Sequence, residues 1–205
     1  LARVVVANRK HAGQPRLKVN NRQEFELDQM HRPIPRLIMR LLILILLFLP
    51  AVGFACPKLL DQQHLKDELF VQLKNTPNEA AAGRVVEKLW EVWLTAPDEK
   101  SQKTLDLGLH LHAQGQFDAA KGAYDALIEY CPDFAEGYNQ RAFVYYLTGR
   151  WALALADLDR AIDLSPRHLG ALSGKGLTLM QLGRQDEAQL MFREALKLNP
   201  WVPER

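Results

Sequence analysis

The sequence has few cysteines, and it lacks the glycine motifs that mark nucleotide-binding loops and nucleophile elbows. Its 205 residues include two cysteines, which is too few for a disulfide scaffold, and their spacing does not match a metal site. No Walker-type loop, zinc motif or G-x-S-x-G sequence occurs. These absences argue against a nucleotide-driven enzyme, a zinc domain and an elbow-type hydrolase.

A basic nucleic-acid-binding face is also missing from the larger part of the chain. The net charge is +2, but residues 1–55 contain nine Lys or Arg against three Asp or Glu. Residues 56–205 contain 17 Lys or Arg against 21 Asp or Glu, so this part is mildly acidic. With 48% hydrophobic and 24% charged residues, the chain as a whole has the composition of a globular protein.

The apolar run before Cys56 is too short for an ordinary membrane-spanning helix. Residues 41–56 carry no charge, whereas a spanning helix needs about 20 apolar residues. Arg40 precedes the run, Pro50 interrupts it, and small residues occupy the −3 and −1 positions of a cut before Cys56. We therefore predict a signal peptide at residues 39–55 and a periplasmic or secreted protein. The alternative is an uncleaved segment that anchors the protein in a membrane.

Cys56 would be the first residue of the mature chain, which raises the question of lipidation. Bacterial lipoprotein signals have an aliphatic residue at −3 and a small one at −2, but here Gly53 and Phe54 stand there. Without a lipid, Cys56 is either an ordinary thiol or the partner of Cys131 in a disulfide, which would require an oxidising compartment.

Residues 1–38 form a polar, basic extension without periodicity. A signal peptide acts at the N-terminus of a protein, and the printed chain begins with Leu rather than Met. Our hypothesis is that translation starts at Met39 and that the extension is a gene-start artefact. We assign it no function.

Residues 56–97 are predicted to form a helical hairpin. Leucine and phenylalanine recur at helical spacing up to Lys74, and Thr76-Pro77-Asn78 is a turn in which Asn78 can cap the next helix. The second helix is expected from Glu79 to Leu94, with an apolar stripe that ends before a Pro-Asp break.

The remaining chain, residues 98–205, contains three copies of a 34-residue unit, at 101–134, 135–168 and 169–202. Five columns recur at this spacing: Pro132, Pro166 and Pro200; Gly115, Gly149 and Gly183; Ala120, Ala154 and Ala188; Tyr124, Leu158 and Phe192; and Gly108, Ala142 and Gly176. Small residues let two helices approach, glycine accepts the positive φ of a helix C-cap, and proline ends the second helix. Because one hairpin cannot bury its apolar face alone, the copies must stack, which predicts an all-α fold.

These columns resemble the tetratricopeptide repeat (TPR) family, whose pattern is W-x2-L-G-x2-Y followed by A, F, A and P. The resemblance implies an α-α superhelix, a TPR solenoid of three repeats, with residues 56–97 as a degenerate repeat or N-terminal cap. The sequence departs from the pattern where the family has Leu, since the second and third copies hold Arg141 and Lys175.

The resemblance also implies a concave groove, lined by the first helix of each unit, in which a protein or peptide partner binds. The candidate groove residues are Asn139, Phe143, Tyr146, Ser173, Leu177 and Met180. Phe143 and Tyr146 are the largest, and the alternative is that they pack against neighbouring helices. Some family members clamp a partner's C-terminal carboxylate with Lys, Asn and Arg, but the corresponding places here hold Leu105, Leu109, Gln140, Gly170 and Gly174. A chaperone-tail clamp is therefore not expected.

Gly170 and Gly174 each weaken a helix by about 1 kcal/mol relative to alanine. Close approach of a partner backbone would explain them, and so would poor optimisation. At the C-terminal edge, either Trp201 and Val202 fold back over the last hairpin or the exposed edge self-associates.

No catalytic, cofactor-binding or metal-binding residue is predicted. His110 and His112 lie too far apart around a helix to share a metal, and no histidine is placed by motif to activate Cys131. Asp157, Asp159 and Asp163 are expected on a solvated face. We therefore predict a non-catalytic adaptor without cofactors. The alternatives are a membrane-tethered assembly factor or an accessory subunit of an envelope enzyme complex, and, in a different class, catalysis through an unrecognised site.

Overall fold

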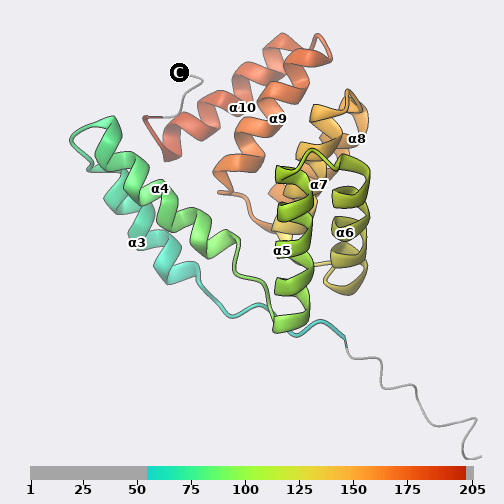
Figure 1. Ribbon diagram of the computed structural model, residues 1–205. Helices are drawn as coiled ribbons and strands as arrows, with labels where there is room; N and C mark the ends of the chain where they lie inside the picture. The colour runs from blue at the N-terminus through green and yellow to red at the C-terminus, as the bar shows by residue number, and fades with distance from the viewer. Residues whose placement is uncertain (1–54, 202–205) are drawn as a thin grey trace, which may run out of the picture. The chain divides into compact units, whose positions relative to one another are not determined.

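The computed structural model describes residues 55–201, and all regular structure within this range is helical (Figure 1). In chain order the helices are α3 (Gln63–Lys74), α4 (Glu79–Trp93), α5 (Glu99–Ala113), α6 (Phe117–Tyr130), α7 (Ala135–Leu147), α8 (Trp151–Leu164), α9 (Leu169–Gln181) and α10 (Gln185–Leu198). The predicted all-α class is confirmed for this part of the chain. None of these helices is long and apolar enough to cross a membrane. Some predictions concern residues that the structure does not describe. These are the predictions for residues 1–38, for residues 39–54 of the signal peptide and for Val202.

Local capping and turn chemistry start and end the helices where the sequence predicts. Asn78 accepts a hydrogen bond from the backbone N–H of Ala81 at 2.9 Å and so begins α4. The hairpin turns of the three repeats contain Gly115, Gly149 and Gly183, whose φ angles are 72°, 71° and 73°. The predicted positive φ at these turns is confirmed, and it explains why glycine recurs there.

The two helices of each repeat pack through matched small and large residues. A Cβ atom on Gly108 would lie 2.3 Å from Cε1 of Tyr124, and one on Gly176 would lie 2.3 Å from Cε1 of Phe192. In the middle repeat the small residue is Ala142, which shares a buried cluster with the less bulky Leu158. Glycine therefore stands opposite an aromatic ring, and alanine suffices opposite leucine.

The two departures from the family's Leu position form ion pairs between helices. Arg141 donates from Nε and a terminal nitrogen to both carboxylate oxygens of Asp157, each at 2.7 Å, and to Asp125 at 2.8 Å. These bonds, first of all those to Asp157, raise the pKa of Arg141. Lys175 reaches Asp159 at 2.6 Å. The expectation that Asp157 is solvated is wrong, since its pairing with Arg141 holds it 7% exposed.

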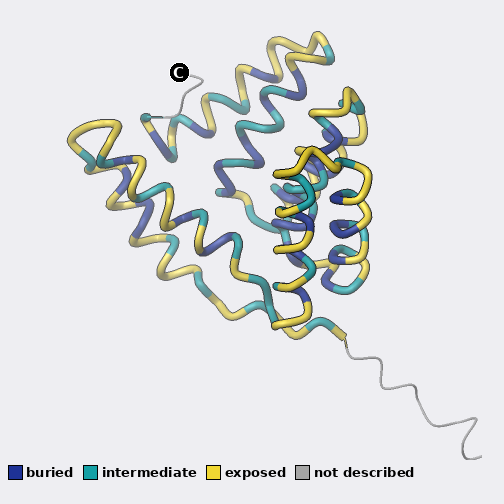
Figure 2. The backbone as a smooth tube through the Cα atoms, in the orientation of Figure 1, coloured by how far each residue is buried: buried dark blue, intermediate teal, exposed yellow. Residues whose placement is uncertain are grey.

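The N-terminal hairpin α3–α4 packs chiefly against the last repeat. Its apolar core of Leu69, Phe70, Leu73, Leu89 and Trp93 includes Leu169 at the start of α9, and the partly buried Leu198 and Trp201 pack against it. Arg167 lies over the ring of Phe70, 4.9 Å from its centre, and pairs with Asp67. Figure 2 shows buried residues on α3 and α4 where the two helices meet. The hairpin thus meets α9 and α10, which lie more than seventy residues later in the sequence.

A disulfide joins Cys56 to Cys131, 75 residues apart, with the two Cα atoms 5.1 Å from each other. It fastens the segment before α3 to the end of α6, where Leu59 packs into the core of the first repeat. Of the three states considered for Cys56, the structure has the disulfide. A sulfur bonded in this way cannot at the same time carry a lipid.

Candidate functional site

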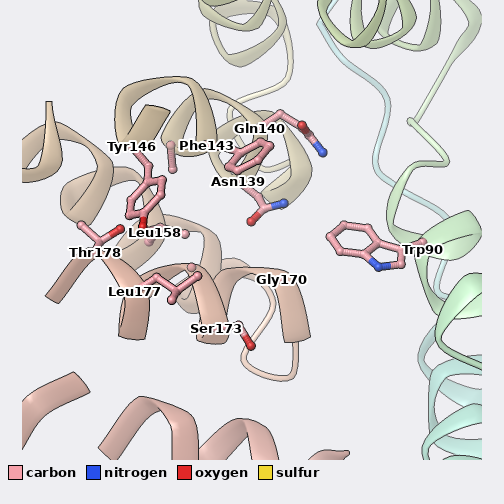
Figure 3. A pocket seen from close by; sticks show the side chains of 12 residues that line it. Trp90, Asn139, Gln140, Phe143, Tyr146, Leu158, Gly170, Ser173, Leu177 and Thr178 are labelled. Atoms are coloured by element: carbon pink, nitrogen blue, oxygen red, sulfur yellow. The ribbon is translucent and has the colours of Figure 1, made fainter. Parts of the chain in front are cut away.

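A cavity of about 290 Å³ lies between α7 and α9, with α4 contributing one wall (Figure 3). Five of the six candidate groove residues line it: Asn139, Phe143, Tyr146, Ser173 and Leu177. The sixth, Met180, is exposed on α9 and is not part of the lining. The structure therefore brings together side chains from two repeats that the family resemblance assigns to one groove, while their role in binding stays a prediction.

The large candidates face the cavity and also touch their neighbours. Phe143 is 48% exposed, and its ring meets that of His112 on α5 edge to face, with 4.9 Å between the ring centres. Tyr146 accepts a long hydrogen bond of 3.5 Å from Gln181. Phe143 therefore leaves about half of its surface open to a ligand. Tyr146 is partly buried and packs against the core cluster of the middle repeat, so packing between helices accounts for part of its surface. Partial burial lowers the pKa of His112, which favours its neutral form beside Phe143.

Trp90 of α4 forms one wall of the cavity, and the sequence did not predict this role for it. A Cβ atom on Gly170 would lie 2.5 Å from Cη2 of Trp90, so the indole occupies the space that any other side chain at this position would need. Gly174 faces Leu158 at 3.2 Å by the same measure. Packing against Trp90 explains Gly170, so neither a partner backbone nor poor optimisation is required there. At Gly174 the end of the Leu158 side chain would have to shift by only a few tenths of an ångström to admit a Cβ atom, so packing does not by itself require this glycine. The repeat pattern could not reveal the contact of Trp90 with Gly170, because α4 lies outside the three repeats.

A buried network of hydrogen bonds between a histidine, a carboxyl group and two amides lies beside the cavity. Nε2 of His168 is 2.7 Å from Oε2 of Glu136, and both side chains are shielded from solvent, at 0% and 1% exposure. Nδ1 of His168 accepts the backbone N–H of Ala171 at 3.2 Å, which places the imidazole proton on Nε2, where it is donated to Glu136. The ring of Trp93 stacks on His168 with 4.2 Å between the centres.

This network fixes which polar atoms the cavity presents. Glu136 accepts hydrogen bonds from the amide nitrogens of Asn139, at 3.2 Å, and Gln140, at 2.5 Å. Because a carboxylate oxygen accepts, the NH₂ end of each amide must face Glu136. The amide oxygens remain as acceptors for a ligand. No charged side chain is among the lining residues.

The cavity therefore combines aromatic walls with a few hydrogen-bonding groups, which is the composition of a binding site. No group of three or more His, Cys, Asp or Glu residues in the described range could hold a metal ion. Cys131 is bonded in the disulfide, so it has no free thiol.

Two models of the tetratricopeptide repeat match the repeat region of this chain. Residues 133–200 match the tetratricopeptide repeat model, and residues 108–149 match a second model described as TPR repeat. DnaJ homolog subfamily C member 3 from Bos taurus is 35% identical over 99 residues, which are 48% of this chain and 20% of that protein. The chain thus spans about a fifth of the length of this relative.

Two further relatives are matched over more of their length. Tetratricopeptide repeat protein 36 from Bos taurus is 36% identical over 113 residues, covering 53% of this chain and 60% of that protein. A TPR repeat-containing protein from Rhizobium etli is 25% identical over 134 residues, covering 65% and 66%. Among solved structures, the first TPR of Spaghetti (RPAP3), bound to the HSP90 peptide SRMEEVD, aligns with a TM-score of 0.51 and 24% identity. It covers 52% of this chain and 84% of the other. This last likeness shows a shared fold.

Proposed function

Since this chain belongs to the tetratricopeptide repeat family, we propose that it is a non-catalytic adaptor that binds a protein or peptide across α7 and α9. The observation that carries the proposal is the cavity of about 290 Å³, in which candidate residues from two repeats converge on one space. Its lining of aromatic and amide side chains suits a peptide, because aromatic rings supply contact area and amides pair with backbone groups.

The partner is expected to bind by an internal segment rather than by its C-terminal carboxylate. The Spaghetti domain was solved with an HSP90 peptide. In this chain the five family clamp places hold leucine, glutamine and glycine, so no cation is available there to pair with a carboxylate. The absence of a cation at these places therefore argues against a chaperone tail as the partner.

The adaptor acts, in this proposal, in an oxidising compartment such as a bacterial periplasm or the extracellular space. The disulfide between Cys56 and Cys131 supports this location, because disulfides persist where thiols are not kept reduced. It also agrees with the signal peptide predicted at residues 39–55, since the pairing uses the residue that would become the new N-terminus.

Fractionation combined with intact-mass analysis tests the location. A soluble product that begins at Cys56 and carries a disulfide supports export. A membrane-bound product that retains residues 41–55 contradicts it and favours the tethered assembly factor or accessory subunit.

Affinity capture with the exported protein as bait tests the binding function. Phe143→Ala and Tyr146→Ala should each lose a partner that the wild-type protein retains from an envelope extract. Leu190→Ala is the matched control, because Leu190 is 53% exposed on α10 and lies away from the cavity. If both cavity variants capture the same proteins as wild type, the proposed binding site is wrong.

A further inference from the structure

The two amide side chains that line the cavity offer it their oxygen atoms. Glu136 accepts the amide nitrogen of Asn139 at 3.2 Å and that of Gln140 at 2.5 Å. No donor in the described part of the chain bonds to either amide oxygen, and both oxygens remain accessible to solvent. Both residues line the cavity. A ligand that enters it therefore meets two open hydrogen-bond acceptors from consecutive residues.

The helices around the cavity place no positive charge in it. Arg141 is the only Lys or Arg of α7, and it pairs with Asp125 and Asp157. Lys175 is the only one of α9, and it pairs with Asp159. Neither cation lines the cavity, and α4 contributes Trp90 alone to the lining. Because the two cations are neutralised by aspartates on other helices, nothing in the walls repels a positively charged ligand.

The buried network behind the amides is also without a cation. His168 is neutral, because its Nδ1 accepts the backbone N–H of Ala171 at 3.2 Å while Nε2 lies 2.7 Å from Glu136. The donors that the structure shows at Glu136 are therefore uncharged. By holding the NH₂ ends of the two amides, Glu136 points the negative ends of their dipoles at the cavity. This arrangement attracts a cation and repels an anion.

The remaining walls decide which cation fits. A cavity of about 150 Å³ holds benzene, so the 290 Å³ measured here has room for a guanidinium group and the methylene chain behind it. Figure 3 shows Trp90 across the cavity from Asn139 and Phe143. The guanidinium group is weakly hydrated, packs well on aromatic rings and carries several N–H donors in one plane. A lysine ammonium is strongly hydrated, so it loses more free energy on entering such a site.

Building on the proposed function, we propose that this cavity is a specificity pocket for one arginine side chain from an internal segment of the partner. The guanidinium group donates to the amide oxygens of Asn139 and Gln140, and its methylene chain packs on Trp90 and Phe143. Glu136 is a positioning residue, because it holds both amides in the orientation that accepts. The charge of residues 56–205, with 17 Lys or Arg against 21 Asp or Glu, agrees with a basic segment.

Selection from a phage-displayed library of random heptapeptides, each held between fixed flanking residues, tests this inference with the exported protein as bait. Arginine should dominate one position of the selected peptides. The selected sequence is then titrated as an acetylated and amidated synthetic peptide, so that no terminal charge contributes. Replacing the arginine by citrulline, which has nearly the same shape but no charge, should weaken binding about 10- to 100-fold. Replacing it by lysine should also weaken binding, because an ammonium group cannot reproduce the planar donors.

Variants at Gln140 locate the effect at the amides. Gln140→Lys puts a positive charge at the cavity and should abolish binding of the arginine peptide. Gln189→Lys adds the same charge at an exposed position of α10 outside the lining, and it should leave binding unchanged. Gln140→Met removes one acceptor at similar size and should weaken binding about 3- to 10-fold. The methionine variant, with Gln189→Met as its control, keeps the test decisive if Gln140→Lys does not fold.

Glu136→Gln tests the positioning role through a ratio of affinities. Without the carboxyl group the two amides are no longer held with their oxygens toward the cavity. The preference for the arginine peptide over the citrulline peptide should therefore fall by at least about 3-fold. Structural damage alone would weaken both peptides equally and leave this ratio unchanged, which would contradict the role assigned to Glu136.

The outcomes separate this inference from the function on which it rests. Peptides that are weakened by Phe143→Ala but carry a conserved lysine, a conserved acidic residue or no conserved charge would overturn the pocket assignment and leave peptide binding intact. An arginine peptide that binds equally well with citrulline or lysine in place of arginine, or that still binds Gln140→Lys, would do the same. A library that yields no peptide weakened by Phe143→Ala would overturn both.

Discussion

The indole of Trp90 lies over Gly170, so close that a Cβ atom at this glycine would be 2.5 Å from Cη2 of the ring. This contact joins the N-terminal hairpin to the first helix of the last repeat. It also forms one end of the cavity between α7 and α9. The closed side of the proposed binding site therefore depends on two residues that the repeat pattern does not connect.

Gly170→Ala should release this contact. The added methyl group must displace Trp90, and overpacking of this kind costs about 1–3 kcal/mol, more than the helix gains from losing a glycine. Chemical denaturation followed by tryptophan fluorescence should show a lower free energy of unfolding and an altered native spectrum. Gly83→Ala is the control, since nothing lies within 4 Å of its Cβ position, and it should stabilise α4 by about 0.4–1 kcal/mol. Equal effects of the two variants would show that Trp90 does not constrain Gly170.

Loss of the disulfide should lower the free energy of unfolding by about 2–5 kcal/mol, because it closes a long loop in the unfolded chain. Cys56→Ser tests this at the less buried of the two cysteines. Reduction of the wild-type protein should produce a similar loss, while the variant should not respond to reductant. If urea unfolding of the wild type is the same with and without reductant, the bond does not stabilise the fold.

The Arg141–Asp157 pair should behave as a coupled unit. Both side chains are largely buried, at 19% and 10% exposure, so Arg141→Leu strands the charge of Asp157 and should cost about 3 kcal/mol. Asp157→Leu should cost less, because Arg141 keeps its hydrogen bond to Asp125. The double variant Arg141→Leu with Asp157→Leu should cost clearly less than the sum of the single variants in a double-mutant cycle.

The pair between Lys175 and Asp159 is the matched control for this cycle, because the Asp159 side chain is 51% exposed. Its coupling should be below about 1 kcal/mol. Strict additivity at Arg141 and Asp157 would contradict the role assigned to their hydrogen bonds.

Acid should weaken the start of α5 through Asp98. Hydrogen bonds from the Ser101 side chain and backbone, followed by that from Tyr130, lower the pKa of Asp98 from its ordinary value of 3.8. Because the folded pKa is below the unfolded one, ionised Asp98 stabilises the fold above the unfolded value, and this contribution is lost as the pH falls through the folded value. Urea unfolding at pH 7 and at pH 3 should show a smaller acid loss for Asp98→Asn than for wild type. An equal loss in both proteins would exclude Asp98 as a source of acid sensitivity.

Features that act within about one repeat could be predicted from the sequence. The caps, the positive-φ turns at Gly115, Gly149 and Gly183, and the pairing of Gly108 with Tyr124 depend on residues close in the chain or on the 34-residue spacing. The shared face of Phe143 and Leu177 was implied by the resemblance to the tetratricopeptide repeat family.

Features that depend on contacts between segments far apart in the sequence could not be predicted in this way. The contact of Trp90 with Gly170 joins a helix outside the repeats to the third repeat, and no periodicity encodes it. Asp157 was expected to be exposed to solvent, because a charged residue on a helix is assigned to the surface unless its partner is known. That partner, Arg141, was visible in the sequence only as a departure from the pattern. Contacts and ion pairs between distant parts of the chain can be identified only from the three-dimensional structure.

The central claim is that a partner segment enters the cavity between α7, α9 and Trp90. Mapping a peptide segment of a captured partner onto the protein by NMR tests it most directly. Titration of the isotopically labelled protein should give the largest chemical-shift changes at Trp90, Phe143, Leu177 and Thr178. Changes concentrated instead around Leu153 and Leu190, on the outward faces of α8 and α10, would contradict the claim.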